Sequence, residues 1–210
     1  MSNGSLGGIF DLRAPTDITP ARFFEEWLPS QVENSRELLE TFAGDISFVV
    51  SVRVTGERGG EWTVRLADRK PEFARGLDPE AVVTFIVSEE NFIQSITGQL
   101  DDLRPPARDM STVDTSPEAI QQRARQVLAA LKDIRGSLRA ELDDPNRALG
   151  VTIKFGGEMK DTPDCIIRIK MDHVRAMASG ELDPQAAFMT GKVKIEGDSS
   201  LLMQLLAATM

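Results

Sequence analysis

The chain has 210 residues, enough for one domain or two small ones, and its 41% hydrophobic content supports a packed core. A formal net charge of −9 argues against nucleic acid and against docking on anionic lipid, since both surfaces are negative. No apolar stretch approaches the roughly 20 residues that span a bilayer, and the single cysteine, Cys165, fits a reducing compartment, so we expect a cytoplasmic protein without integral membrane association.

The N-terminal region predicts a flexible lead followed by a helix. Residues 1–19 are rich in Gly, Ser, Asp and Pro, which is typical of a flexible segment. From Pro20 the apolar residues follow a helical spacing. Pro29 should divide this helix, because proline has no N–H and clashes with the preceding turn. Gly44 should end it.

Residues 46–54 and 61–67 predict a β-hairpin around the turn GERGG. Apolar and polar residues alternate in both segments, and a period of two indicates a strand with one buried face. Residues 70–77 and 81–88 predict two further strands, and residues 89–98 a short helix that Gly98 closes. The buried side of this hairpin should hold Phe48, Val50, Trp62, Val64 and Leu66.

Residues 106–117 predict a linker between an N-terminal part, 20–105, and a C-terminal part, 118–210. Ser116 and Pro117 are a typical N-cap and first-turn pair. The apolar face of the helix that they start continues to Leu142. Strands at 150–159 and 164–170, a helix at 171–180, a strand at 192–196 and a helix at 199–209 should follow. Their strands should bury Cys165, Ile167, Val193 and Ile195.

The two parts share an internal repeat. Placing Phe73 on Phe155, an offset of 82 residues, aligns residues 92–101 with 174–183 and strand 81–88 with 163–170, without a gap. We interpret this as a duplicated strand–helix unit, with chance similarity between amphipathic segments as the alternative. Only the first copy has the hairpin, and only the second has AFMTGKVKIEG.

The run GELDPQAAFMTGKVKIEGDSSLLMQLL resembles the end of the sterol carrier protein 2 family of sterol- and lipid-transfer proteins. The N-terminal part matches more loosely, and has Asn91 where the family often has an acidic residue before Phe. The resemblance implies an α+β fold, with a mixed five-stranded sheet, helices on one face and an apolar tunnel between them. The 117–142 helix could begin a second domain or be an insertion in one composite domain. Eleven positions fit the family pattern: Gly180, Leu182, Pro184, Ala187, Phe188, Gly191, Lys192, Val193, Lys194, Ile195 and Gly197.

The C-terminal helix has more apolar surface than packing on a sheet requires. Only Gln204 and Thr209 are polar in LLMQLLAATM, and methionine suits a cavity that adapts to different ligands. With the resemblance, this predicts a lid over a tunnel for sterol, fatty acyl or other lipid. The alternative is a filled tunnel and a helix that meets another helix or subunit, as in an interaction protein or homodimer. The predicted lining is Phe92, Ile93, Ile96, Met177, Phe188, Met189, Leu201, Leu202, Met203, Leu205, Leu206 and Met210.

No set of residues in the sequence suggests catalysis. His173 is the only histidine, which excludes a two-histidine metal site. Cys165 alternates with Ile167 and Ile169 and should be a buried, poorly ionised thiol. We therefore expect a non-catalytic carrier without metal or cofactor. Residues 5–12, SLGGIFDL, are similar to the cargo-loading tails of encapsulin nanocompartments and could dock on a protein partner.

Overall fold

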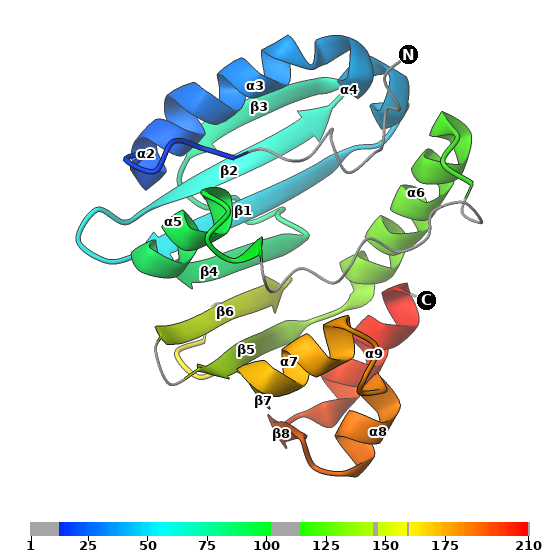
Figure 1. The fold of residues 1–210 in the computed structure, drawn as a ribbon. Coiled ribbons are helices and arrows are strands. Elements are labelled where there is room, and N and C mark those ends of the chain that lie inside the picture. Colours follow the sequence, from blue (N-terminus) through cyan, green and yellow to red (C-terminus); the bar gives the residue numbers. More distant parts are fainter. Residues whose placement is uncertain (1–12, 102–113, 145–146, 159, 210) are drawn as a thin grey trace.

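The computed structural model of the chain describes residues 13–101, 114–144, 147–158 and 160–209 (Figure 1). Its strands form one eight-stranded sheet in the order β3-β2-β1-β4-β6-β5-β7-β8. The β1–β4 and β5–β7 pairs are parallel and the other neighbours are antiparallel, so the sheet is mixed. The strands are β1 Phe48–Thr55, β2 Gly60–Ala67, β3 Lys70–Arg75, β4 Val83–Ser88, β5 Gly136–Asp144, β6 Arg147–Phe155, β7 Cys165–Lys170 and β8 Val193–Gly197.

The α+β class and the mixed sheet are confirmed, but the expectation of five strands is wrong. The two predicted parts do not build separate sheets, because β4 of the first part pairs with β6 of the second. Figure 1 shows one group of helices beside β1–β3 and another beside β5–β8. The helices are α2 Pro20–Arg22, the π-helix η1 Phe23–Trp27, α3 Leu28–Asn34, α4 Arg36–Ala43, α5 Glu89–Ile96, α6 Pro117–Asp133, α7 Met171–Ala178, α8 Pro184–Met189 and α9 Ser199–Thr209.

The helical region before β1 continues past Pro29 and breaks at Ser35 instead. The backbone N–H of Leu28 donates to the carbonyl of Phe23, five residues earlier, so the turn before the proline is a wide π turn. A wider turn tolerates the missing N–H of the proline, which explains why the expected break at Pro29 is wrong. At Ser35 the backbone leaves the helical region, with φ −106° and ψ 19°. Gly44, with φ +55°, ends the region as predicted.

The first hydrophobic core lies between α2, η1, α5 and the β1–β2 hairpin. The ring of Phe24 stacks on Trp62 at 4.9 Å and on Phe92 at 5.4 Å between centroids. Ala14 and Ile18 are buried in the same core, and the N–H of Ala14 donates to the carbonyl of Ile96 at 2.8 Å. Within the segment that the sequence predicts to be flexible, Ala14 and Ile18 thus have packing partners, and the flexibility itself stays a prediction. Residues 1–12, with the possible docking segment, lie outside the described residues.

The second hydrophobic core lies between α6, α9 and strands β4–β8. Its helix α6 begins after the Ser116 cap, as predicted, but ends at Asp133. The residues from Gly136 to Leu142 are not helical. They belong to β5, which pairs with β6 in a hairpin. The expectations of a helix to Leu142 and of no hairpin in the second part are both wrong. Gly136, with φ +124°, makes the turn from helix to strand, a conformation that L side chains rarely adopt.

Strand register places the predicted core residues on one side of the sheet. Val52 pairs with Trp62 and Phe85, and this row continues through Ile153, Leu138 and Cys165. Paired residues share a face, and both cores lie on this face. Trp62, Leu66 and Cys165 are buried as predicted, whereas Phe48, Val50, Val64, Ile167, Val193 and Ile195 are half-buried.

The opposite face is polar but is covered beside β1 and β2. Ser51 is buried there, its hydroxyl 2.8 Å from that of Thr63 and accepting from the N–H of Asp78. Thr63 donates in turn to the carbonyl of Gly76. The segment between β3 and β4 therefore crosses this face, which the alternation pattern had predicted to be open.

The two predicted repeat copies have the same element boundaries at the 82-residue offset. β4 with α5 spans 83–96, and β7 with α7 spans 165–178. Gly98 and Gly180 follow at equivalent positions, both with φ +80°. The short helices at 92–98 and 174–180 are thus equivalent in structure, while their origin in a duplication stays a prediction.

Candidate ligand-binding site

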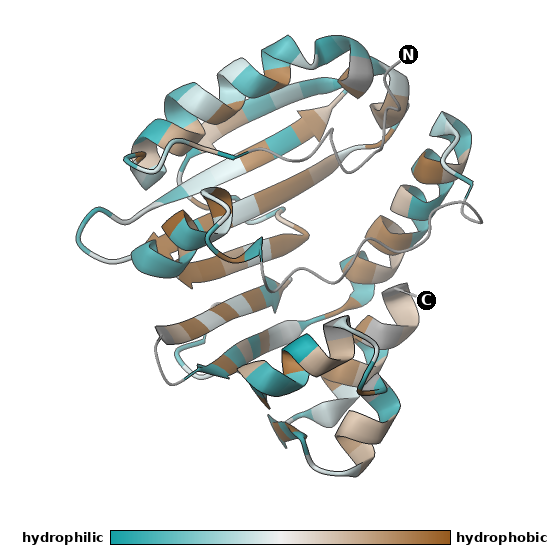
Figure 2. Cartoon of the chain, viewed as in Figure 1, coloured by the Kyte–Doolittle hydropathy of each residue, from teal (hydrophilic) through white to brown (hydrophobic). Residues whose placement is uncertain are grey.

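An apolar groove lies on the helix-covered face, between the two hydrophobic cores. Figure 2 shows hydrophobic residues along much of β4 and in bands across β6. The cavity there has a volume of about 460 Å³. Its lining residues are Val52, Phe85, Val87, Asn91, Phe92, Ser95, Leu100, Ala140, Leu142, Leu149, Gly150 and Val151.

The groove results from pairing between the two parts of the chain. Val87 on β4 pairs with Val151 on β6, which pairs with Ala140 on β5, so their side chains share the helix-facing side. Ala140 has a small side chain where its same-side neighbours on β5 are Leu138 and Leu142. The floor is therefore apolar and is deepest at its centre, beside Ala140.

Asn91 is the buried polar residue of this groove, with a relative exposure of 9%. Its backbone N–H donates to the Ser88 hydroxyl at 3.2 Å, and its side-chain Nδ2 donates to the carbonyl of Gly150 at 3.2 Å. Within the described ranges its Oδ1 has no hydrogen-bond partner. Ser95, the other polar side chain of the lining, donates to the carbonyl of Phe92. The groove thus offers one unused acceptor.

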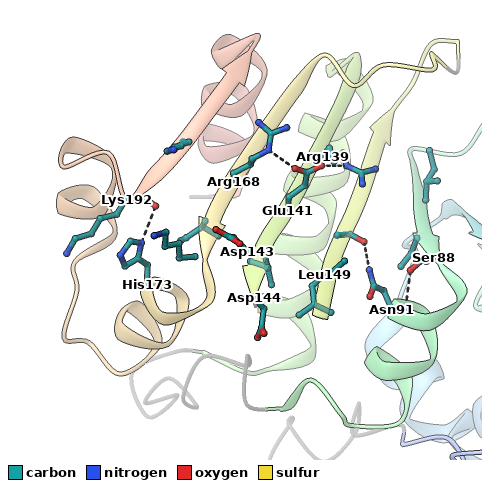
Figure 3. A pocket seen from close by; sticks show the side chains of 18 of the residues that line it. Ser88, Asn91, Arg139, Glu141, Asp143, Asp144, Leu149, Arg168, His173 and Lys192 are labelled. Atoms are coloured by element: carbon teal, nitrogen blue, oxygen red, sulfur yellow. Dashed lines mark hydrogen bonds and ion pairs between the residues drawn. The ribbon is translucent and has the colours of Figure 1, made fainter. Parts of the chain in front are cut away.

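A larger polar cavity, about 950 Å³, adjoins the groove at the end of the sheet where α5 and α7 begin (Figure 3). Arg139 and Arg168 each donate to Glu141 at 2.6 Å. These hydrogen bonds, first that from Arg139 and then that from Arg168, hold the pKa of the Glu141 carboxyl below its ordinary value. The two cavities have Val87, Asn91, Leu142, Leu149 and Gly150 in common.

His173 stands in α7 where Asn91 stands in α5, at the 82-residue offset. Its Nδ1 lies 3.3 Å from the carbonyl oxygen of Lys192, just before β8, as Asn91 Nδ2 contacts a carbonyl of β6 (Figure 3). The Asn91 side chain therefore links the start of α5 to β6, and the His173 side chain links the start of α7 to the residue before β8. The contact thus gives His173 a structural partner at the start of α7.

The structure places the predicted lining residues in separate regions. Phe92 lines the groove, and Ile93 and Ile96 pack against the first core. Leu201 is 2% exposed in the second core, where Leu202 and Leu205 also pack. Met177 is half-buried. The others are exposed or outside the description: Phe188 (53%), Met189 (78%) and Met203 (65%) are exposed, while the side chain of Leu206 and all of Met210 lie outside the described residues.

Neither the groove nor the polar cavity has a described lining residue from α9. The residues that line the groove from β5 and β6 were not predicted, because 136–142 was assigned to a helix. Their one signal in the sequence was the alternation of Leu138, Ala140 and Leu142 with charged residues.

The described residues show no group suited to a metal. They contain no cluster of three or more His, Cys, Asp or Glu side chains that could hold an ion. Cys165 is fully buried, and burial, with the nearby Asp198 charge, raises the pKa of its thiol. Within the same ranges, no helix is long and apolar enough to cross a membrane.

Residues 118–209 match the sequence profile of the SCP-2 sterol transfer family. The resemblance predicted from the C-terminal motif is thereby confirmed for this segment, which runs from α6 to α9. No curated protein sequence matches the chain significantly.

Solved structures match at low similarity. Sterol carrier protein 2 like 2 from Aedes aegypti is 14% identical over 42% of this chain and 97% of its own, with a TM-score of 0.29. Sterol carrier protein 2 from Yarrowia lipolytica is 20% identical over 57% and 89%, with a TM-score of 0.28. The sec-alkylsulfatase Pisa1 from Pseudomonas sp. is 15% identical over 56% of this chain and 20% of its own, with a TM-score of 0.27.

Proposed function

We propose that the chain is a non-catalytic carrier that binds an apolar ligand, a sterol, fatty acyl chain or other lipid, in the groove between its two cores. The observation that supports this most directly is an apolar cavity whose described lining residues include no charged side chain. Its volume of about 460 Å³ falls within the ~300–1,000 Å³ typical of small-molecule sites. The family match of residues 118–209 supports the same class of ligand.

The energetics allow such binding. A chain of about sixteen carbons, at ~0.8 kcal/mol per buried CH₂, would gain on the order of 10 kcal/mol before ordering costs. Losses of ligand and side-chain freedom reduce this to micromolar or tighter affinity. No charged contact is required for this affinity.

In this proposal the parts 20–105 and 118–210 are two sterol-carrier-like halves from a duplicated unit. Strand β4 of the first half pairs with strand β6 of the second half. The ligand site lies at this junction, whereas α9 closes the second core. This differs from a tunnel beneath α9, since Leu201 fills that space.

A second candidate function is supported by a different observation. Three large apolar side chains are exposed on the last two helices, Phe188 and Met189 on α8 and Met203 on α9. Large exposed apolar side chains mark a protein-interaction surface where they form a contiguous patch. An accessory protein with the space beneath α9 filled would use this surface, or the N-terminal segment, to dock.

The test is the affinity for a fluorescent long-chain probe in a variant with a filled groove. Ala140→Phe should lower the affinity at least about tenfold, because the ring occupies the groove floor. Ala129→Phe, at an exposed position of α6, is the matched control and should bind as the wild type does. Circular dichroism should show both variants folded. Absence of probe binding to the wild type, or equal affinity in the two variants, would contradict the carrier function.

A further inference from the structure

The orientation of the Asn91 amide follows from its neighbour. The Gly150 oxygen 3.2 Å away is a carbonyl and can only accept, so the atom that faces it must be Nδ2. Oδ1 is then the atom without a partner, on a side chain that is nine-tenths buried. Figure 3 shows this hydrogen bond from Asn91 Nδ2 to β6 as a dashed line.

An acceptor left unpaired in an apolar site is unfavourable, because it has lost its bonds to water without replacement. Asn91 lines both the apolar groove and the polar cavity beside it. Oδ1 is closed off from solvent within the described residues, so the polar end of a lipid in the groove would meet it after a rotation of the Asn91 amide. Gln94 Oε1 is also unpaired, but Gln94 does not line the groove.

The Asn91 amide oxygen distinguishes lipids by the polar group at the end of their chain. The amide oxygen needs a donor, which a hydroxyl supplies and an ionised carboxylate does not. A carboxylate there would face another oxygen, in a lining without a cationic side chain. The cationic side chains of the polar cavity, such as Lys170, Lys192 and Lys194, line only that cavity.

We propose that Asn91 Oδ1 accepts a hydrogen bond from the hydroxyl of a bound neutral lipid, so that the chain prefers long-chain alcohols to the corresponding carboxylates. This rests on the proposed function, because it assigns the polar end of the ligand in the same groove. Asn91 is then the residue that determines specificity, and the apolar lining supplies affinity.

The experiment compares three sixteen-carbon ligands, hexadecan-1-ol, its methyl ether and hexadecanoate, by displacement of a fluorescent probe at pH 7.4. The wild-type protein should bind the alcohol about tenfold more tightly than the ether, which lacks the donor. Hexadecanoate should also bind more weakly than the alcohol. This comparison needs no substitution and so does not depend on how a variant folds.

Two variants test whether Asn91 causes the preference for the alcohol over the ether. Asn91→Leu is similar in size and has no acceptor, so it should bind alcohol and ether equally. Gln94→Leu is the matched control, since it also removes an unpaired amide oxygen of α5 but lies outside the groove lining, and it should keep the preference.

The outcomes separate the two proposals. If neither the probe nor any of the three ligands binds, the proposed function fails. If they bind but the wild type does not distinguish alcohol from ether, or prefers hexadecanoate, only the role of Asn91 is overturned. A preference that persists in Asn91→Leu would also overturn it.

Discussion

At the scale of single residues, Asp164 shows how one carboxylate joins two strands. It accepts hydrogen bonds from the backbone and hydroxyl of Ser137, at the start of β5, and from Lys160. These bonds, that of Lys160 first, lower the pKa of the Asp164 carboxyl from its ordinary value of 3.8. Its backbone carbonyl also accepts from Asp198, beside the end of β8. Asp164 thus ties β5, β7 and β8 together at one end of the sheet.

The first prediction concerns pH. Because the folded pKa is lowered, the stability from ionised Asp164 is complete above the unfolded pKa of 3.8 and is lost as pH falls through the folded value. Asp164→Asn should cost about 1–2 kcal/mol at pH 7 and progressively less as the pH falls below 4. Thermal unfolding between pH 7 and pH 2.5 measures this difference.

Asp172→Asn is the matched control for Asp164→Asn. The Asp172 side chain is 92% exposed and its contact with Arg175 is 3.5 Å long, so stability should change little at any pH. A wild-type advantage over Asp164→Asn that is as large at pH 2.5 as at pH 7 would contradict the ionic origin of the effect.

At the scale of elements, α9 has an explanation for its many apolar residues. Leu201, Leu202 and Leu205 pack into the second core, while Met203 is 65% exposed. The helix therefore closes a core, and its remaining apolar surface faces outward.

The second prediction separates these two faces of α9. Leu201→Ala should lower the free energy of unfolding by about 2–5 kcal/mol, because it leaves a cavity in the second core. Met203→Ala, the control, should stay within about 0.5 kcal/mol of the wild type. Urea unfolding measures both. Neither variant should change probe affinity more than about twofold while folded; a folded Leu201→Ala that cannot bind the probe would place the ligand beneath α9.

Most elements, but not the site, could be predicted from the sequence. Alternation identified seven of the eight strands, and the predicted cap at Ser116 marks a true helix start. Strand β5 was missed because Leu131, Ile134, Leu138 and Leu142 also fit a helical spacing. The groove could not be predicted, since it depends on β4 pairing with β6, and no local pattern specifies which edge strands meet.

At the scale of the whole molecule, β4 belongs to both cores. Val83 is buried in the second core, and Val87 packs against the first. A second link joins α4 and α6, through an ion pair between Arg125 and Asp45 and a hydrogen bond from Gln121 to the carbonyl of Thr41. The two halves should therefore unfold together.

The third prediction tests this coupling. Both tryptophans, Trp27 and Trp62, lie in the first half, so their fluorescence reports that half, whereas circular dichroism reports the whole chain. Leu138→Ala, in the second core, should lower both thermal midpoints by the same amount. Two transitions, with the fluorescence midpoint unchanged, would contradict a single cooperative unit.

The carrier proposal depends on where a ligand lies, and methyl NMR with hexadecan-1-ol tests this most directly. We predict that methyl signals of groove residues, namely Val52, Val87, Leu142, Leu149 and Val151, shift on titration. Signals of Leu202 and Leu205, in the second core, should stay in place. Shifts confined to these two leucines, or no shift at saturating ligand, would contradict a lipid site between the two cores.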